Sequence, residues 1–367
     1  MKTEINIRAL LPPITSMHLS DIVEPAAYIG AAGFEDRALA VLERAANESK
    51  KIDHVVGIQY LPFDKRNRVD EFNAKVAKLG VSNEQFKRLT YNRCYPQEFV
   101  SLVEDIKAMA EKVSSLIIDI SAMSKFLIVT LLQSLRNIPV RVEIAYAEAD
   151  IYHPTRDVFE WQKQLQKEAT PEFLTTDIYK IVTTTSLSSS SMQGYPLLIV
   201  AFPTFNYREL LALLNEITPH HFILLEGKPH ESHNAWRLEA IRRLNRIIEE
   251  NVLTTRTIST FDYLETLTAL EEIYQDHHHT HKFLVSPTGS KLQTFSVFLF
   301  RQMHPDIQLI YPVTREFASE YTSGCSAIWQ ISIPCLADLV GWLDTYRKQS
   351  LLQLKAGIAN RLRRQRT

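Results

Sequence analysis

The order of strands, loops and helices in the first half of this chain is repeated in its second half, at an offset of about 170 residues. Each half opens with a short apolar run, at Pro25–Gly30 and at Leu197–Val200, and each later has a strand followed by a Ser-Lys pair. The corresponding landmarks are Phe34 and Arg37 with Phe205 and Arg208, Asn67 with Asn234, Ile106 with Ile273, and Ser124-Lys125 with Ser290-Lys291. The sequence therefore predicts two copies of one structural unit.

The pattern within each copy indicates the class of fold. Continuous apolar runs such as Leu116–Ile120 and Lys282–Val285 are typical of buried strands, and helical periodicity separates them. Strands that alternate with helices of this length form parallel sheets. We expect an α/β protein made of two tandem Rossmann-like doubly wound parallel-sheet units, which arose by internal duplication, plus a basic C-terminal helical tail.

Changes in composition along the chain indicate the boundaries between these parts. The tract Thr183–Ser191 is rich in serine and threonine, as linkers often are. A strand at Gln308–Tyr311 closes the second unit. The predicted parts are a first unit at 1–160, a connecting helix and Ser/Thr-rich linker at 161–195, a second unit at 196–333 and the tail at 334–367.

The composition excludes several classes of protein. The 367 residues are 45% hydrophobic and 23% charged, with a formal net charge of −1, so no global field draws the chain to nucleic acid or to anionic lipid. Three scattered cysteines make no disulfide framework. The N-terminus lacks the features of a signal peptide, and no apolar stretch approaches the ~20 residues that span a bilayer. We expect a cytoplasmic protein with no membrane contact.

The Ser-Lys loops are the strongest functional signal. Each follows a strand and opens a helix, and ligands of doubly wound folds bind at this edge of the sheet. A lysine in the first helical turn faces the positive end of the helix dipole, which becomes favourable when an anion lies between them. The predicted phosphate-binding residues here are Ser121, Ser124, Lys125, Thr288, Gly289, Ser290 and Lys291. In the alternative interpretation Ser121 and Thr288 are only helix N-caps, and the lysines point to solvent.

The loops after the first strands add further candidates. Parallel strands place these loops beside the Ser-Lys loops, so Glu35 and Arg37 are expected near Lys125, and Arg208 near Lys291. Arginine suits bidentate contacts with phosphate. An arginine on an exposed helix face is the alternative.

Other motifs are weaker. The tract His277–His281 resembles a metal-binding sequence but lacks helical or hairpin ligand spacing, so we expect no metal site. His230 and His233 are interpreted as loop surface that could reach a ligand over the second sheet. No Walker loop, dinucleotide glycine fingerprint or nucleophile elbow occurs, so we expect no cofactor and assign no catalytic residue.

The two units with their Ser/Thr-Lys loops resemble the CARF domains of CRISPR-linked proteins, and also the SAVED domains, which look like two fused CARF units. The resemblance would cover residues 25–325. The residues that match are Ser121, Ser124 and Lys125 in the first unit, and Thr288, Gly289, Ser290 and Lys291 in the second. The first loop departs from the glycine-rich pattern with Ala122 and Met123. The resemblance implies a sensor of cyclic oligonucleotide or related nucleotide messengers in prokaryotic, CRISPR-linked or anti-phage defence.

Two other functions stay open. Some CARF proteins cleave their messenger, so a phosphodiesterase of the ring-nuclease type is one alternative. A non-catalytic scaffold subunit of a defence complex is the other. The C-terminal tail is basic from Arg347 onward and has apolar residues on one face, so it could contact a protein effector or nucleic acid. A solvated helix docked on the body is the alternative for the tail.

Overall fold

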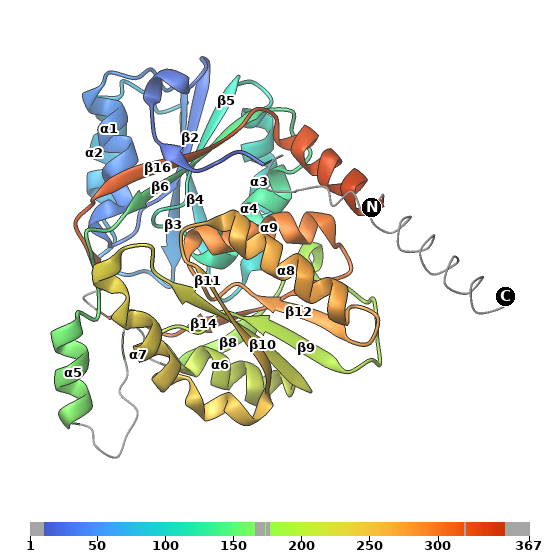
Figure 1. Ribbon diagram of the computed structural model, residues 1–367. Helices are drawn as coiled ribbons and strands as arrows, with labels where there is room; N and C mark the ends of the chain where they lie inside the picture. Colours follow the sequence, from blue (N-terminus) through green and yellow to red (C-terminus); the bar gives the residue numbers. More distant parts are fainter. Residues whose placement is uncertain (1–10, 166–172, 174–176, 319–320, 349–367) are drawn as a thin grey trace.

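The computed structural model describes residues 11–165, 173, 177–318 and 321–348. Its two main sheets lie in two halves of the molecule, the first above and the second below in Figure 1. The end of the predicted basic tail, from residue 349 onward, lies outside the described residues.

The first sheet is built on five parallel strands in the order β4-β3-β2-β5-β6. Their bounds are β2 Ala26–Ala31, β3 His54–Leu61, β4 Phe86–Asn92, β5 Ser115–Asp119 and β6 Arg141–Glu148. Strand β16 (Ala327–Ile333) pairs antiparallel with β6, and β1 (Thr15–Ser16) pairs antiparallel with β16. The central strand β2 is buried along its whole length because helices cover both faces of the sheet.

The second sheet has the same topology. Its parallel strands lie in the order β11-β10-β9-β12-β13. Their bounds are β9 Leu197–Ala201, β10 His221–Lys228, β11 Val252–Ser259, β12 Lys282–Ser286 and β13 Gln308–Leu309. Counted along the chain, both sheets have the order third, second, first, fourth, fifth, which is a doubly wound arrangement. The predicted fold class and its internal duplication are confirmed.

Side-chain alternation along β2 directs two cores to opposite faces of the first sheet. Tyr28 packs with α1 (Ala40–Asn47) and α2 (Val69–Lys78), whereas Ile29 packs with α3 (Pro96–Ala110) and α4 (Lys125–Leu135). The other helices are α5 Arg156–Leu165, α6 Arg208–Ala212, α7 Trp236–Leu244, α8 Tyr263–His277 and α9 Lys291–Met303.

Helix α4 is buried around almost its entire circumference because it lies between the halves. It packs against the first sheet and against α9 of the second half, and one apolar core runs through both. Phe126 of α4 stacks on Tyr311, with ring centroids 5.9 Å apart. Gln302 of α9 donates to Gln133 of α4 at 2.7 Å. This shared core holds the two halves together.

Three chain segments cross the boundaries drawn from the sequence. Strand β16 ends at residue 333 and was assigned to the second unit, but it pairs with β6 in the first sheet (Figure 1). Strand β8 (Ile178–Val182), in the expected linker, pairs with β14 (Tyr311–Thr314). The strand expected at Gln308–Tyr311 divides between β13 and β14, because Ile310 turns the chain from one partner to the other. A second small sheet joins β7 (Ile151–Tyr152) of the first unit to β15 (Thr322–Ser323).

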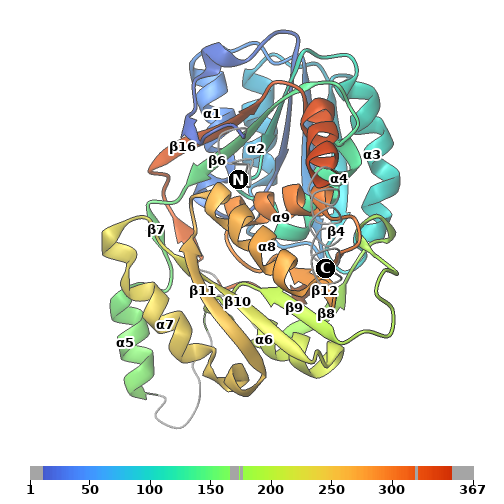
Figure 2. The same cartoon turned by 45° about the vertical axis from the view of Figure 1, so that its right-hand side comes forward.

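The chain returns to the first half after β16. Residues 336–348 are helical and lie along this half (Figure 2). Leu336 and Leu343 are fully buried in the shared core, and the amide of Leu336 donates to Val140 O. The described part of this helix is therefore docked on the body. Across the described residues, we find no helix with the length and apolar character needed to cross a membrane.

Candidate functional site

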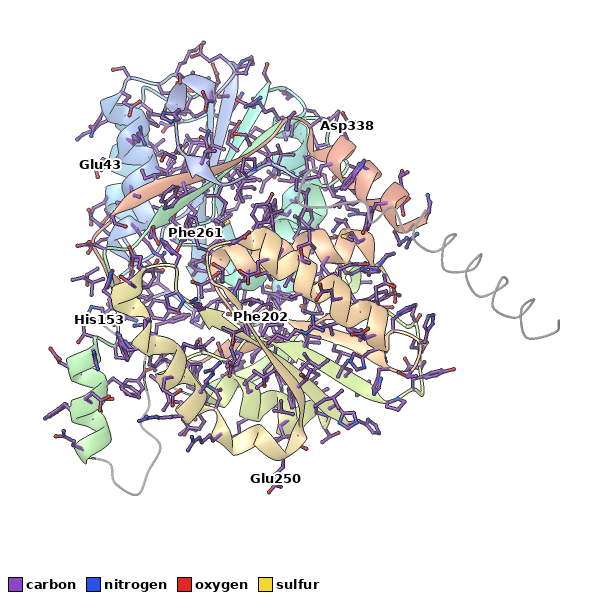
Figure 3. All side chains as sticks on the ribbon, viewed as in Figure 1. Glu43, His153, Phe202, Glu250, Phe261 and Asp338 are labelled. Carbon is purple, nitrogen blue, oxygen red and sulfur yellow. The ribbon has the colours of Figure 1, made fainter. Side chains whose placement is uncertain are left out.

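A cavity of about 310 Å³ lies where the carboxyl ends of the two parallel sheets meet. Its walls come from the loops after β2, β5 and β6 of the first half and after β9, β10 and β12 of the second. Phe261, which lines it, lies at the border between the halves (Figure 3). The predicted residues that line the cavity are Glu35, Arg37, Ser124, Lys125, Gly289, Ser290 and Lys291.

Ser124 and Ser290 are the N-caps of the two helices that begin at the cavity. Ser124 Oγ accepts a hydrogen bond from Leu127 N at 3.3 Å, and Ser290 Oγ accepts one from Gln293 N at 3.1 Å. Gln293 Oε1 in turn accepts from Ser290 N at 2.8 Å, which completes a capping box. Both loops thus end in stable caps whose helix dipoles point into the same cavity.

Ser121 and Thr288 have a different role from the one predicted. Both are fully buried and neither lines the cavity. Ser121 Oγ donates to Asp119 and accepts from Ala147 N, and Thr288 Oγ1 exchanges two hydrogen bonds with the main chain of Phe202. Their hydroxyls hold each loop against a neighbouring strand end. They are neither ligand donors nor the N-caps of the alternative interpretation.

The two lysines reach across the junction in opposite directions. Lys125 Nζ donates to Thr288 O at 2.5 Å, and Lys291 Nζ donates to Met123 O. Each ammonium therefore binds a main-chain carbonyl in the loop of the other half. Neither lysine has a carboxylate within ion-pair distance among the described residues. An ammonium has three donors, so each can also bind a ligand.

Burial makes both ammonium groups costly. Desolvation lowers the pKa of Lys125, opposed by Glu209 and Glu35. Desolvation lowers the pKa of Lys291 to about 7; the attraction of Glu35 opposes this effect, and the repulsion of Arg37 and Lys125 adds to it. A buried positive cluster of this kind becomes more favourable when an anion enters it.

Glu35 and Arg37 form a buried ion pair at the edge of this cluster. Arg37 Nε and Nη2 lie 2.9 and 2.8 Å from Glu35 Oε2, and Thr322 Oγ1 donates to the same oxygen at 2.6 Å. Burial would raise the pKa of Glu35, but Arg37, Lys291 and Thr322 together lower it. Glu35 interacts with both Lys125 and Lys291, whereas Arg37 interacts with Lys291, so the prediction that both residues face Lys125 describes only part of the arrangement.

Arg208 does not occupy the place of Arg37. It lies outside the cavity lining and pairs with Asp177 at 2.6 Å, so the prediction that it faces Lys291 is wrong. The next residue, Glu209, points into the cavity instead. It is buried, accepts a hydrogen bond from Thr204 Oγ1 at 2.9 Å and interacts with Lys125. The backbone directs the neighbouring residue inward because α6 begins at Arg208, with Tyr207 as its N-cap.

Asn206, beside these residues, also lines the cavity. It is 6% exposed, and its Nδ2 has no hydrogen-bond partner in the described part of the chain. A buried amide without a partner is costly, and a ligand acceptor in the cavity would satisfy it.

Two arginines complete the basic wall, and neither was among the residues predicted from the sequence. Arg93 follows β4, has an unpartnered Nη1 within the described residues and lies over the Phe317 ring at 4.8 Å. Arg237 of α7 donates to the main-chain oxygens of residues 152–154 and lies 4.5 Å from the Phe205 ring centroid. Their only sequence signal was proximity to strand ends and to the Asn234 landmark.

Aromatic rings form much of the remaining surface. The rings that line the cavity are Phe34, Tyr60, Tyr146, Tyr152, Phe205, Phe261, Tyr311, Phe317 and Tyr321. Tyr60 is fixed to the first Ser-Lys loop, since its hydroxyl donates to Ala122 O at 3.0 Å and accepts from Ser124 N at 2.7 Å. A cavity with cations and many rings suits a ligand that carries both phosphate and planar groups.

Comparisons with known proteins give no family. No protein-family model matches the chain, and a search of curated proteins found no match. Among solved structures, a putative universal stress protein from Pseudomonas aeruginosa UCBPP-PA14 aligns with 88% of this chain and 97% of its own, at 8% identity and a TM-score of 0.24. A functionally unknown protein from Pseudomonas aeruginosa PAO1 aligns over the same shares at 10% identity and a TM-score of 0.23. At these scores the assignment of the fold rests on the strand order alone.

Proposed function

We propose that the cavity binds a cyclic oligonucleotide or a related nucleotide messenger between the two halves, and that the protein is a sensor in prokaryotic defence. The observation that carries this proposal is the meeting of the two Ser-Lys loops in one cavity. Lys125 and Lys291 each cross to the opposite loop, so both halves contribute equivalent cations to one binding volume.

The charge around the cavity supports a phosphate-bearing ligand. Lys125, Lys291, Arg93 and Arg237 line it, and none has a carboxylate within ion-pair distance in the described residues. The positive ends of α4 and α9 point into the same volume. The two buried acids nearest the lysines are Glu35 and Glu209. Burial raises the pKa of Glu209, and this makes its neutral form less costly beside an anion.

The pseudo-symmetry supports a ligand with repeated units. The helix that follows each Ser-Lys loop packs against its counterpart, so the two loops face the cavity as a related pair. A cyclic oligonucleotide presents phosphates and bases at regular intervals around a ring. The aromatic walls give its bases surfaces on which to stack. Because one chain supplies both loops, the site needs no dimer to assemble it.

The test is thermal unfolding of the full chain with a panel of cyclic and linear oligonucleotides, followed by analysis of the nucleotide. A ligand at 100 times its dissociation constant adds about 2.7 kcal/mol to the free energy of unfolding, which raises Tm measurably. A shift with intact ligand supports the sensor. A shift with cleaved ligand supports the phosphodiesterase alternative. No shift with any nucleotide contradicts both and leaves the scaffold alternative.

A further inference from the structure

Three metal-ligating side chains from both halves meet at the wall of the cavity. Glu148 ends β6 of the first half, and His230 and Glu231 lie in the loop after β10 of the second. One ligand atom from each lies within 4.8 Å of the other two. Among the residues that the structure describes, this is the group of histidine, cysteine and carboxylate side chains with such spacing.

The spacing of these atoms suits a metal ion. His230 Nε2 lies 3.4 Å from Glu148 Oε1. Nitrogen and oxygen ligands about 2.1 Å from a tetrahedral ion lie about 3.4 Å apart. The pair therefore already has the separation of two ligands on one ion. A small movement of Glu231, which is on a half-exposed loop, would bring the third ligand to the same distance.

Neighbouring groups orient the carboxylates of Glu148 and Glu231. They bond one oxygen of each and leave the other oxygen available to a metal ion. Trp329 Nε1 donates to Glu148 Oε2 at 2.9 Å, and Asn234 Nδ2 donates to Glu231 Oε2 at 2.9 Å. Within the described chain, Glu231 Oε1 has no hydrogen-bond partner. The ring of His230 packs on Phe261 with centroids 4.4 Å apart. Such supporting contacts are a regular feature of metal sites, because they fix the ligands before the ion arrives.

The local charge also favours a cation. Glu148 is 5% exposed, yet no lysine or arginine of the described residues lies within ion-pair distance of it or of Glu231. In the part of the chain that the structure describes, their ion-pair partners are histidines, His230 for Glu148 and His233 for Glu231. A buried carboxylate without a strong cation is costly, and a divalent ion would supply the missing positive charge.

We propose that Glu148, His230 and Glu231 bind a divalent cation of the Mn²⁺ or Zn²⁺ class, for which mixed imidazole and carboxylate ligands are suitable. All three residues line the cavity, so the ion's remaining positions face it. In a step that rests on the proposed function, the ion would hold a phosphate oxygen of the nucleotide in the cavity that the lysines also line.

The test is titration of the metal-free full chain with Mn²⁺ alone. Binding is measured as the loss of the free Mn²⁺ signal in electron paramagnetic resonance. His230→Ala and Glu231→Gln are each expected to weaken binding about 10-fold or more. His277→Ala removes a histidine of the tract His277–His281 and is expected to leave Mn²⁺ binding unchanged. Glu231→Gln also keeps the Asn234 contact, so it remains informative if His230→Ala fails to fold.

Two results would overturn the metal site: wild-type protein that binds no more Mn²⁺ than His230→Ala, or binding that His277→Ala abolishes. Neither result bears on the nucleotide proposal, because the thermal-shift panel is run in parallel with a chelator. A nucleotide shift that persists with chelator, beside a failed Mn²⁺ titration, leaves the sensor and removes only the ion.

Discussion

Lys125 and Lys291 occupy equivalent positions in the two halves, and each ammonium donates to a carbonyl in the loop that carries the other lysine. The contacts join the first turns of α4 and α9 across the junction. An anion that draws either ammonium away from its carbonyl would change how the two loops are held. Ligand binding and the relative placement of the halves are therefore coupled through two side chains.

The first prediction is that Lys125→Met and Lys291→Met each strongly reduce the thermal shift caused by a nucleotide that stabilises the wild type. Methionine keeps an apolar stem of similar length but removes the charge that binds phosphate. Lys282→Met is the matched control, since Lys282 is the first residue of β12, at the other end of the strand from the second loop, and its Nζ donates to Gln193. Equal shifts in all three variants would contradict the proposed site.

The second prediction concerns the free energy of unfolding as a function of pH. The pKa of Lys291 is about 7 in the folded chain, below its ordinary value of 10.5. Below pH 7 both states are protonated, so the folded state bears the full cost of the buried charge. Between about pH 7 and 10.5 the unfolded state binds more protons, so stability rises with pH. We expect wild type to gain stability relative to Lys291→Met from about pH 6 to about pH 9 in urea titrations. A difference that stays constant across this range would contradict the assignment.

The third prediction uses the same ionisation to test ligand binding. A phosphate ligand needs the protonated ammonium, so its affinity for wild type should fall as pH rises above 7, where Lys291 loses its proton. Calorimetric titrations at several pH values measure this. Residual binding by Lys291→Met should lack that dependence. An identical pH profile for the two proteins would assign the effect to another group.

The fourth prediction contrasts a buried and an exposed ion pair. Glu35→Ala leaves the Arg37 guanidinium, 3% exposed, without its carboxylate, and should cost about 3–5 kcal/mol. Glu48→Ala breaks the Arg44–Glu48 pair, whose side chains are 35% and 47% exposed, and should cost about 1 kcal/mol or less. Denaturant unfolding measures both. Arg37 Nη1 also donates to the Tyr146 hydroxyl and to Ala147 O, each at 3.3 Å, and similar costs would mean that these contacts suffice to stabilise it.

The fifth prediction concerns two glycines with opposite surroundings. A Cβ on Gly289 would lie 2.3 Å from Gln293 Oε1 and 2.9 Å from the Phe202 ring, so Gly289→Ala should disrupt the capping box and lower Tm. A Cβ on Gly341, in the last described helix, meets nothing within 4 Å. Gly341→Ala should raise stability by up to about 1 kcal/mol through helix propensity. A lower Tm for Gly341→Ala would contradict this account.

The interior of both sheets could be predicted because parallel strands buried on both faces are continuous apolar runs, as in Leu116–Ile120. The edge strands β4 and β11 were missed. Their solvent-facing positions carry Lys87, Arg88 and Arg256 among scattered apolar residues, and the resulting pattern has neither a continuous run nor a helical period. The return of β16 to the first sheet was also missed, because pairing between distant segments leaves no local signal.

The core of the candidate site could be predicted for a related reason. Strand-to-loop-to-helix order fixes which residues reach the carboxyl edge of a sheet, and this places Lys125 and Lys291. The identity of the inward residue within a loop depends on where the helix starts. A helix that begins at Arg208 turns Glu209 inward, and a cap at Ser290 leaves Thr288 buried. Arg93, Arg237 and most of the aromatic wall arise from tertiary contacts between halves, which neither periodicity nor composition encodes.

The return of β16 means that the first half is not one continuous stretch of chain. Strand β6 is covered by β16, and the sequence between them contains the whole second sheet. A fragment that stops near residue 160 would therefore expose the main-chain groups of β6 as an unpaired edge, and such edges recruit other chains. Expression of the first half alone should give aggregates. A fusion that reconnects β6 to residues 327–348 through a short linker would cover this edge, but it would still expose the face of α4 that packs against α9.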